Sequence, residues 1–146
     1  MAGNLKQNAD LSMGIQGTDG TDGEFIIVPF YWNGVVNTAA VLVLEGPTLT
    51  RRMIVKSIQH GTSVAATNAV TATVYKAPAG TAIGSGTALH SGTANLQATA
   101  ATPVTLTLST TSGVVDVAAG NRLGVVISGA VGAAGVGCIT VTLAPA

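Results

Sequence analysis

Strict alternation of apolar and hydroxyl side chains runs through Ile139-Thr140-Val141-Thr142-Leu143 near the end of the chain. Successive side chains of a β-strand point to opposite faces of its sheet, so one face of this segment is apolar and the other carries threonines. The segment Val104-Thr105-Leu106-Thr107-Leu108 repeats the pattern. Both segments therefore predict half-buried antiparallel strands whose apolar side chains point into a core.

Further strands are predicted on both sides of these two. The period of two continues over residues 70–75 and 122–127, and it places six more side chains inward: Val70, Ala72, Val74, Leu123, Val125 and Ile127. Residues 52–59 form another candidate strand, whose phase is ambiguous because Lys56 falls between Ile54 and Ile58.

Residues 25–32 and 38–44 are more continuously apolar. They predict two strands covered on both faces and joined by a tight turn at Asn33-Gly34. Pro29 has no backbone N–H to donate, so we expect the first of these strands to lie at a sheet edge or at a bulge.

No apolar stripe at helical spacing continues for more than two turns. Seven or eight short strands separated by Gly, Pro, Ser and Asn are typical of an all-β domain. The sequence therefore predicts an antiparallel β-sandwich with jelly-roll or Greek-key topology, with a small closed barrel as the alternative. Residues 77–86 are rich in glycine and predict a long surface loop that is a candidate contact site.

The first 24 residues differ from the rest of the chain. They hold Lys6 against four acidic residues, a net charge of −3, and the remainder carries +3. We predict a flexible N-terminal arm over residues 1–24 ahead of a sandwich domain over residues 25–146. Four apolar side chains could anchor this arm on a partner: Leu5, Leu11, Met13 and Ile15. A calcium loop starting at Asp19 is disfavoured, because Gly23 stands where an EF-hand needs an oxygen ligand.

Charge is scarce in the composition. Of 146 residues, 8% are charged and 47% are hydrophobic, and the formal net charge is zero. Nucleic-acid binding needs clustered cations, so it is not expected. A surface of small uncharged residues suits a protein packed into an assembly, and we expect self-association as a dimer or trimer. The longest apolar runs are too short to span a membrane. The opening residues lack the apolar segment of a secretion signal, so we expect assembly in a cytoplasm.

No catalytic, cofactor-binding or metal-binding constellation is predicted, and we expect a protein that is not an enzyme. His60 and His90 lie at predicted strand ends and are interpreted as surface or turn histidines. Glu45 and Asp116 lie beside turns and are interpreted as solvated carboxylates. The single cysteine, Cys138, is interpreted as an inert, half-buried thiol.

Two clusters are candidates for binding. Arg51, Arg52 and Lys56 hold three of the six cations, and they form either a solvated strand end or a docking site for an acidic partner. Phe30-Tyr31-Trp32 holds three of the five aromatic residues. Such a cluster is more often a core or interface anchor than a platform for a sugar.

Two stretches resemble the small jelly-roll virion proteins of tailed bacteriophages. They are Thr73-Val74-Tyr75-Lys76-Ala77-Pro78-Ala79-Gly80-Thr81-Ala82-Ile83-Gly84-Ser85-Gly86 and Val117-Ala118-Ala119-Gly120-Asn121-Arg122-Leu123-Gly124-Val125-Val126-Ile127-Ser128-Gly129. The second is similar to the turn before a late strand of such jelly rolls, with Asn121 where an acidic residue is common.

The resemblance implies a capsid cement (decoration) protein of the short-tailed phage type. Such a protein binds the exterior of a virion capsid assembled in the host cytoplasm, and it stabilises the shell of the major capsid protein. The family supplies no catalytic residues. The alternative is a receptor- or carbohydrate-binding β-sandwich module of a phage fibre, which would use residues 30–32 or the loop over residues 77–92.

Overall fold

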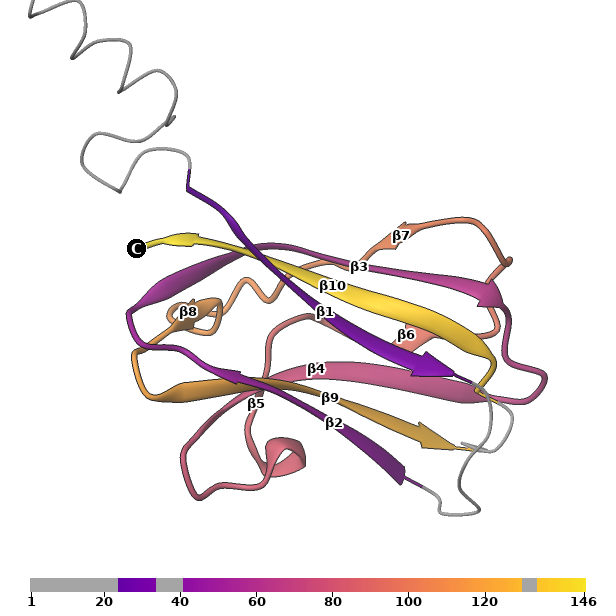
Figure 1. Ribbon diagram of the computed structural model, residues 1–146, viewed down its shortest axis with the longest axis horizontal. Helices are drawn as coiled ribbons and strands as arrows, with labels where there is room; N and C mark the ends of the chain where they lie inside the picture. Colours follow the sequence, from indigo (N-terminus) through magenta and orange to yellow (C-terminus); the bar gives the residue numbers. More distant parts are fainter. Residues whose placement is uncertain (1–23, 34–40, 130–133) are drawn as a thin grey trace, which may run out of the picture.

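Two antiparallel sheets face each other in a computed structural model that describes residues 24–33, 41–129 and 134–146 (Figure 1). Sheet A has the order β1 (Ile26–Asn33), β10 (Val136–Pro145), β3 (Met53–Val64) and β7 (Val104–Thr105), and β8 (Asp116–Val117) also pairs with β3. Sheet B has the order β2 (Val41–Thr48), β9 (Asn121–Gly129), β4 (Val70–Pro78) and β5 (Thr87–Ala88), and β6 (Ala94–Asn95) also pairs with β4. The predicted all-β antiparallel sandwich is confirmed, and the alternative of a single closed barrel is excluded.

The strand pairs are nested along the chain. β1 pairs with β10, β2 with β9, and β3 with β8, while β4 pairs with the short β5 and β6. Successive long strands from β1 to β4 do not pair with one another, because β1 and β3 belong to sheet A and β2 and β4 to sheet B. This wrapping of early strands around late ones is the jelly-roll topology.

The first two strands depart from their sequence-based prediction. β1 and β2 do not form a hairpin, since they belong to different sheets, and residues 34–40 between them lie outside the described part. Neither strand is covered on both faces. In β1 the side chains of Val28, Phe30 and Trp32 are buried, whereas Ile27 and Tyr31 are exposed. In a two-layer sandwich the outer face of a strand has no sheet above it, so a continuously apolar strand exposes half of its side chains.

The position of Pro29 agrees with its prediction. β1 is the outermost strand of sheet A and has a single partner, β10. An edge strand tolerates a residue that cannot donate a backbone hydrogen bond.

The core lies between the sheets. Of the twelve side chains predicted to point inward, nine are at most 1% exposed: Val70, Ala72, Val74, Leu123, Val125, Ile127, Ile139, Val141 and Leu143. The other three, Val104, Leu106 and Leu108, are half-buried, because β7 covers Val104–Thr105 alone and not the full predicted strand. Leu106 and Leu108 pack against the edge of the core.

The ambiguous phase of residues 52–59 has a structural cause. In the ladder with β10, Thr142 pairs with Ser57 and Leu143 with Val55, so Lys56 is an extra residue at a β-bulge. Val55 and Ile58 are consequently both buried although three positions separate them. A bulge shifts the period of two by one residue, and no single phase fits both halves of β3.

The predicted loop over residues 77–86 is shorter and better anchored than expected. β4 continues to Pro78, and a single 3-10 turn, η1 (Ile83–Ser85), buries the side chain of Ile83. None of the described helical segments is long and apolar enough to cross a membrane.

Candidate interaction surfaces

The outer face of sheet A is built from three long strands with little charge. The outward positions of β1 and β10 alternate in register, with Ile27 beside Thr142 and Tyr31 beside Cys138. Ile27 and Tyr31 are 62% and 70% exposed. Lys56, at the bulge of β3, is the single charged residue in the strands β1, β10 and β3. A flat, uncharged surface with exposed large apolar side chains can be desolvated at small cost.

The outer face of sheet B is partly covered by its own chain. The loop after β4 folds back over β9, and a Cβ placed on Gly124 would lie 2.7 Å from the Ile83 side chain. Gly84 in the same loop lies against Val126. Because this loop occupies part of sheet B, the outer face of sheet A is the more accessible of the two broad surfaces.

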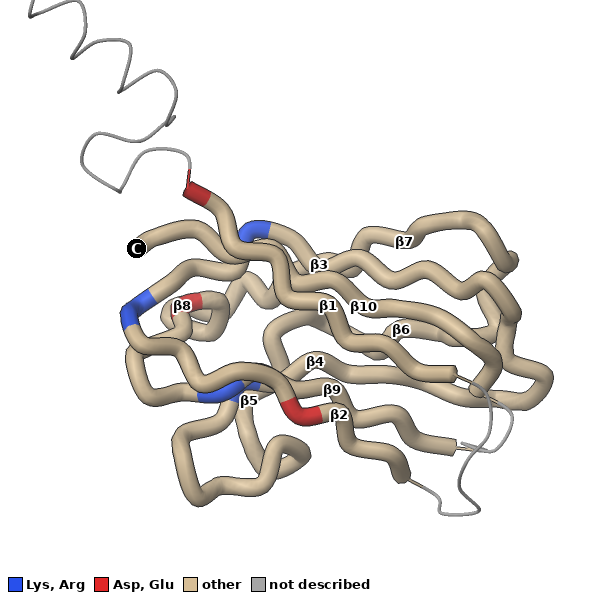
Figure 2. Tube along the Cα trace, in the orientation of Figure 1, with Lys and Arg blue, Asp and Glu red and all other residues tan. Residues whose placement is uncertain are grey.

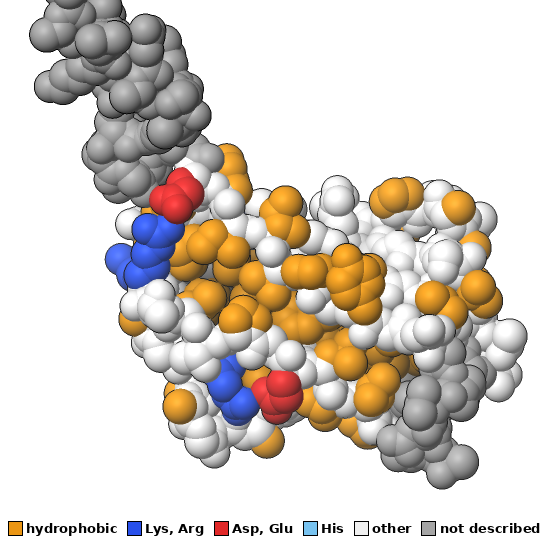
Figure 3. Space-filling model, in the orientation of Figure 1, with side chains coloured by type: hydrophobic (Ala, Val, Ile, Leu, Met, Phe, Trp, Pro, Cys, Tyr) orange, Lys and Arg blue, Asp and Glu red, His pale blue; other side chains and the backbone are white. Residues whose placement is uncertain are grey.

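A third surface is the side of the sandwich where β1 and β2 form the edges of the two sheets. Figure 3 shows this side, where apolar side chains gather over both strands and charged groups lie toward its margin. We call it the β1–β2 side; its exposed large side chains on β2 are Val41 and Val43. Phe30 closes the gap between the sheets, because its ring reaches to 2.6 Å from where a Cβ on Gly46 would lie.

The predicted basic cluster is separated and its two arginines are engaged within the chain. Arg51 and Arg52 precede β3, whereas Lys56 lies within it. The three cations of the cluster therefore do not share one face of a regular strand. Arg51 pairs with Glu24 at 3.2 Å. The Nε of Arg52 donates to Asp116 Oδ1 at 2.9 Å, and its terminal nitrogen donates to Oδ2. Lys56 is exposed, and no ion pair forms at it among the described residues.

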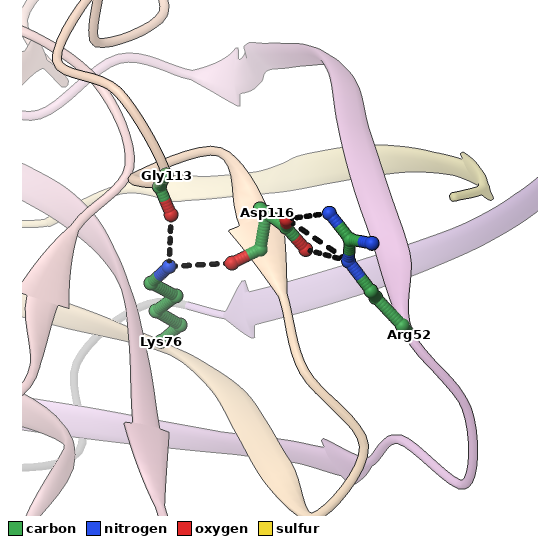
Figure 4. A network of polar contacts seen from close by, with 4 residues as sticks. All are labelled: Arg52, Lys76, Gly113 and Asp116. Atoms are coloured by element: carbon green, nitrogen blue, oxygen red, sulfur yellow. Dashed lines mark hydrogen bonds and ion pairs between the residues drawn. The ribbon is translucent and has the colours of Figure 1, made fainter.

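Asp116 belongs to a network that joins the two sheets (Figure 4). Lys76 on β4 of sheet B donates from Nζ to the backbone oxygens of Gly113, at 2.7 Å, and of Asp116 on β8 of sheet A. The hydrogen bond from Arg52 lowers the pKa of the Asp116 carboxyl. Burial lowers the pKa of the Lys76 ammonium, and the charge of Asp116 opposes that shift. The network fixes the loop that leads into β8.

Asp116 and Glu45 were interpreted as solvated turn carboxylates, and both take part in ion pairs instead. Glu45 lies within β2 and accepts from Arg122 on β9 at 2.6 Å. Figure 2 shows how few charged residues the described part of the chain carries and that most of them lie near a residue of opposite charge.

The interpretation of both histidines as surface or turn residues is wrong, since both are buried. His60 points inward from β3, two residues after Ile58. Burial lowers its pKa, and the charge of a protonated His90 would lower it further. Among the described residues its Nδ1 meets no hydrogen-bond partner. Burial also lowers the pKa of His90, opposed by a hydrogen bond to Ser91.

His90 replaces a missing piece of strand. β5 pairs with Tyr75 and Lys76, and β6 pairs with Thr71 and Ala72, which leaves a gap at Val74 between them. The Nε2 of His90 accepts the N–H of Val74 at 3.0 Å, and the backbone N–H of Leu89 donates to the Val74 oxygen at 2.9 Å. The imidazole therefore satisfies a buried strand edge, which is a structural role.

The aromatic cluster divides between the two faces of β1. Phe30 and Trp32 are buried, and Trp32 Nε1 donates to the Ala134 oxygen at 3.0 Å. This confirms their interpretation as core anchors and leaves Tyr31 alone at the surface.

Other predicted features have simpler outcomes. Cys138 is half-buried, as expected, and lines a shallow surface pocket of about 260 Å³ with Gln59, His60, Gly61, Pro103 and Thr140. Leu5, Leu11, Met13 and Ile15, together with the calcium-loop candidate at Asp19, lie outside the described residues. In the ranges that the structure describes, no group of three or more His, Cys, Asp and Glu side chains could hold a metal ion.

The sequence and the structure were compared with those of known proteins. Neither a protein-family model nor a curated protein matches the sequence. Among solved structures, the chain is similar to one described as "Cyanophage Pam1 capsid asymmetric unit", with 13% identity, a TM-score of 0.46 and 92% of each chain covered.

Proposed function

We propose that this chain is a structural, non-catalytic protein of a phage virion. It binds the exterior of the capsid and cements the shell of the major capsid protein. The observation that carries the proposal is the outer face of sheet A, which is broad, almost uncharged and open to a partner. The resemblance of two stretches of the sequence to phage jelly-roll virion proteins supports a phage capsid as the particle.

The docking surface is centred on Ile27 and Tyr31. These side chains are large and exposed, and their neighbours on β10 are small or hydroxyl-bearing, so a shell protein could cover them without stranding a charge. Lys56 at the edge of the same sheet can meet an acidic group of the partner. Arg51 and Arg52 contribute less, because Glu24 and Asp116 already compensate their charges.

The segment before β1 supplies a second contact in this proposal. It carries Leu5, Leu11, Met13 and Ile15, and each could contribute roughly 1.5–3 kcal/mol if a partner buried it fully. The segment joins the domain at Glu24, directly before β1 of the same sheet.

Co-sedimentation tests the proposal. The full chain should pellet with purified shells of the phage whose genome encodes it, and Tyr31→Asp should reduce the bound fraction at least tenfold. Thr87→Asp places the same charge on an exposed position of sheet B and should bind as the original chain does. Failure of the original chain to pellet would refute the proposal, and equal loss in both variants would refute the assignment to sheet A.

A fibre module that binds a carbohydrate receives less support. Stacking on a sugar uses exposed aromatic rings, and the burial of Phe30 and Trp32 leaves one ring of the cluster available.

A further inference from the structure

The edge of β2 differs from every other sheet edge in the described part of the chain. β5, β6, β7 and β8 are two residues long, and β1 carries Pro29 at its centre. Short strands and prolines are ordinary ways to prevent a sheet edge from pairing with another chain. β2 has its proline, Pro47, and its register shift at its far end, after Glu45. The five residues before them, from Val41 to Glu45, contain no proline or lysine and form an unbroken ladder with β9.

The first four of these residues are apolar on both faces. Val41 and Val43 point outward and are 47% and 43% exposed, and Leu42 and Leu44 are half-buried at the rim of the core. The backbone groups on the side away from β9 meet no other strand among the described residues. An apolar edge of this kind is a template for strand addition.

We propose that β2 pairs antiparallel with β2 of a second copy of this chain, which joins the two copies of sheet B into one continuous sheet. Pairing centred on Val43 places Val43 opposite its copy and Leu42 opposite Leu44 of the second copy. Such a contact uses the same residues on both chains, as a two-fold interface requires.

The distribution of charge favours a second copy of this chain as the partner of β2. Glu45 is the one charged residue of β2, and its ion pair with Arg122 at 2.6 Å already compensates it. Two copies can therefore approach without burying an unpaired charge, whose desolvation would oppose association.

The size of the contact is also adequate. Eight residues of β1 extend about 27 Å, and two stacked sheets with their side chains are about 20–25 Å deep, which gives the β1–β2 side an area of roughly 600 Å². Two copies would together bury about 1,200 Å², which is the lower end of the range for specific, stable interfaces. The two-fold axis would run perpendicular to the sheets, so β1 would also approach its copy, and the outer faces of both copies of sheet A would point the same way.

Disulfide trapping tests both the pairing and its register in the full chain. With Cys138→Ser as background, Val43→Cys should form a disulfide-linked dimer under mild oxidation, since opposite Cα atoms lie about 4.5–5.5 Å apart. Val41→Cys is the matched control. Its cysteine would lie about 14 Å from its copy in this register, beyond the reach of a disulfide. Equal crosslinking of the two variants, or none at position 43, would overturn the proposed register.

Sedimentation without any shell protein tests the association independently of the proposed function. The original chain should sediment with twice the 14.3 kDa mass of a single chain. Val43→Lys should sediment as a single chain, and Val64→Lys, at a 54% exposed valine of β3, should remain a dimer. A monomeric original chain at about 200 μM would overturn the proposal. So would a dimer that survives Val43→Lys but is lost in Leu11→Asp, because the segment before β1 would then make the contact.

Discussion

The buried histidines predict that acid destabilises this domain well above the pH at which carboxylates titrate. The chain contains two histidines, and the structure buries both. In the unfolded chain a histidine has a pKa of about 6.5, whereas burial lowers the pKa of His60 and His90 in the folded chain. Above pH 6.5 both states are neutral and stability is unaffected. Below it the unfolded chain takes up protons that the folded chain refuses, so stability falls as the pH falls toward the folded pKa values.

The magnitude follows from the number of protons. Because the unfolded imidazole is half protonated at pH 6.5, each histidine that stays neutral in the folded chain costs up to about 1 kcal/mol between pH 6.5 and 5.5, and the pair up to about 2 kcal/mol. For a domain of this size that loss lowers the Tm by roughly 4–8 °C.

Circular dichroism melts at pH 7.5, 6.5 and 5.5, at constant ionic strength and low protein concentration, measure the effect. His60→Leu removes one titrating group and the unpartnered Nδ1, so its Tm should fall about half as much over the same interval. A Tm that does not change between pH 6.5 and 5.5, or an unchanged slope in His60→Leu, would refute burial of neutral histidines as the cause.

Three further substitutions test the packing that positions the surfaces. Gly46→Ala should destabilise the domain by about 1–3 kcal/mol in urea unfolding, because its Cβ would lie 2.6 Å from the Phe30 ring and 2.7 Å from the Leu123 oxygen. The control Gly84→Ala, whose Cβ would meet an ordinary contact at 3.5 Å, should change stability by less than about 0.5 kcal/mol. Equal effects of the two substitutions would contradict the close approach at Gly46. Ile83→Ala should cost about 2–5 kcal/mol and make the loop after β4 sensitive to protease, since its buried side chain is the anchor of that loop; an unchanged cleavage pattern would argue against the anchor. Arg52→Leu should speed hydrogen exchange of the loop before β8 while leaving β10 protected, because the hydrogen bonds to Asp116 hold that loop; uniform exchange throughout would show that the network does not act locally.

The two-sheet fold could be predicted because the alternation in the long central strands leaves one possible phase. Leu123, Val125 and Ile127 of β9, and the matching residues of β10, have a strand on each side and a sheet below them, so the period of two is fully expressed in their burial. The pairing of β1 and β2 could not be predicted in this way. Asn33-Gly34 is a strong local signal for a hairpin, but the pairing is decided by strands more than seventy positions away along the chain.

The histidines were misinterpreted for a related reason. Counting inward positions from Ile58 places His60 and Thr62 in the core, but the bulge at Lys56 conceals that phase when the count begins at Val55. His90 carries no periodic signal, because its role is to accept one backbone N–H of β4 from outside any regular strand. The ion pairs of Arg51 and Arg52 were likewise hidden, since their partners Glu24 and Asp116 are distant in sequence and are brought close by the fold.

The pairing of β1 with β10 has a mechanical consequence. Ile26 at the start of β1 lies opposite Leu143 near the end of β10, so both strands present their ends at one corner of the sandwich (Figure 1). A load applied between residues 24 and 146 would peel the ladder open from that corner, breaking one pair of residues at a time. Holding the domain near Val136 instead, opposite Asn33, would load all eight pairs together in shear. The resistance of this domain to force thus depends on where a partner grips it.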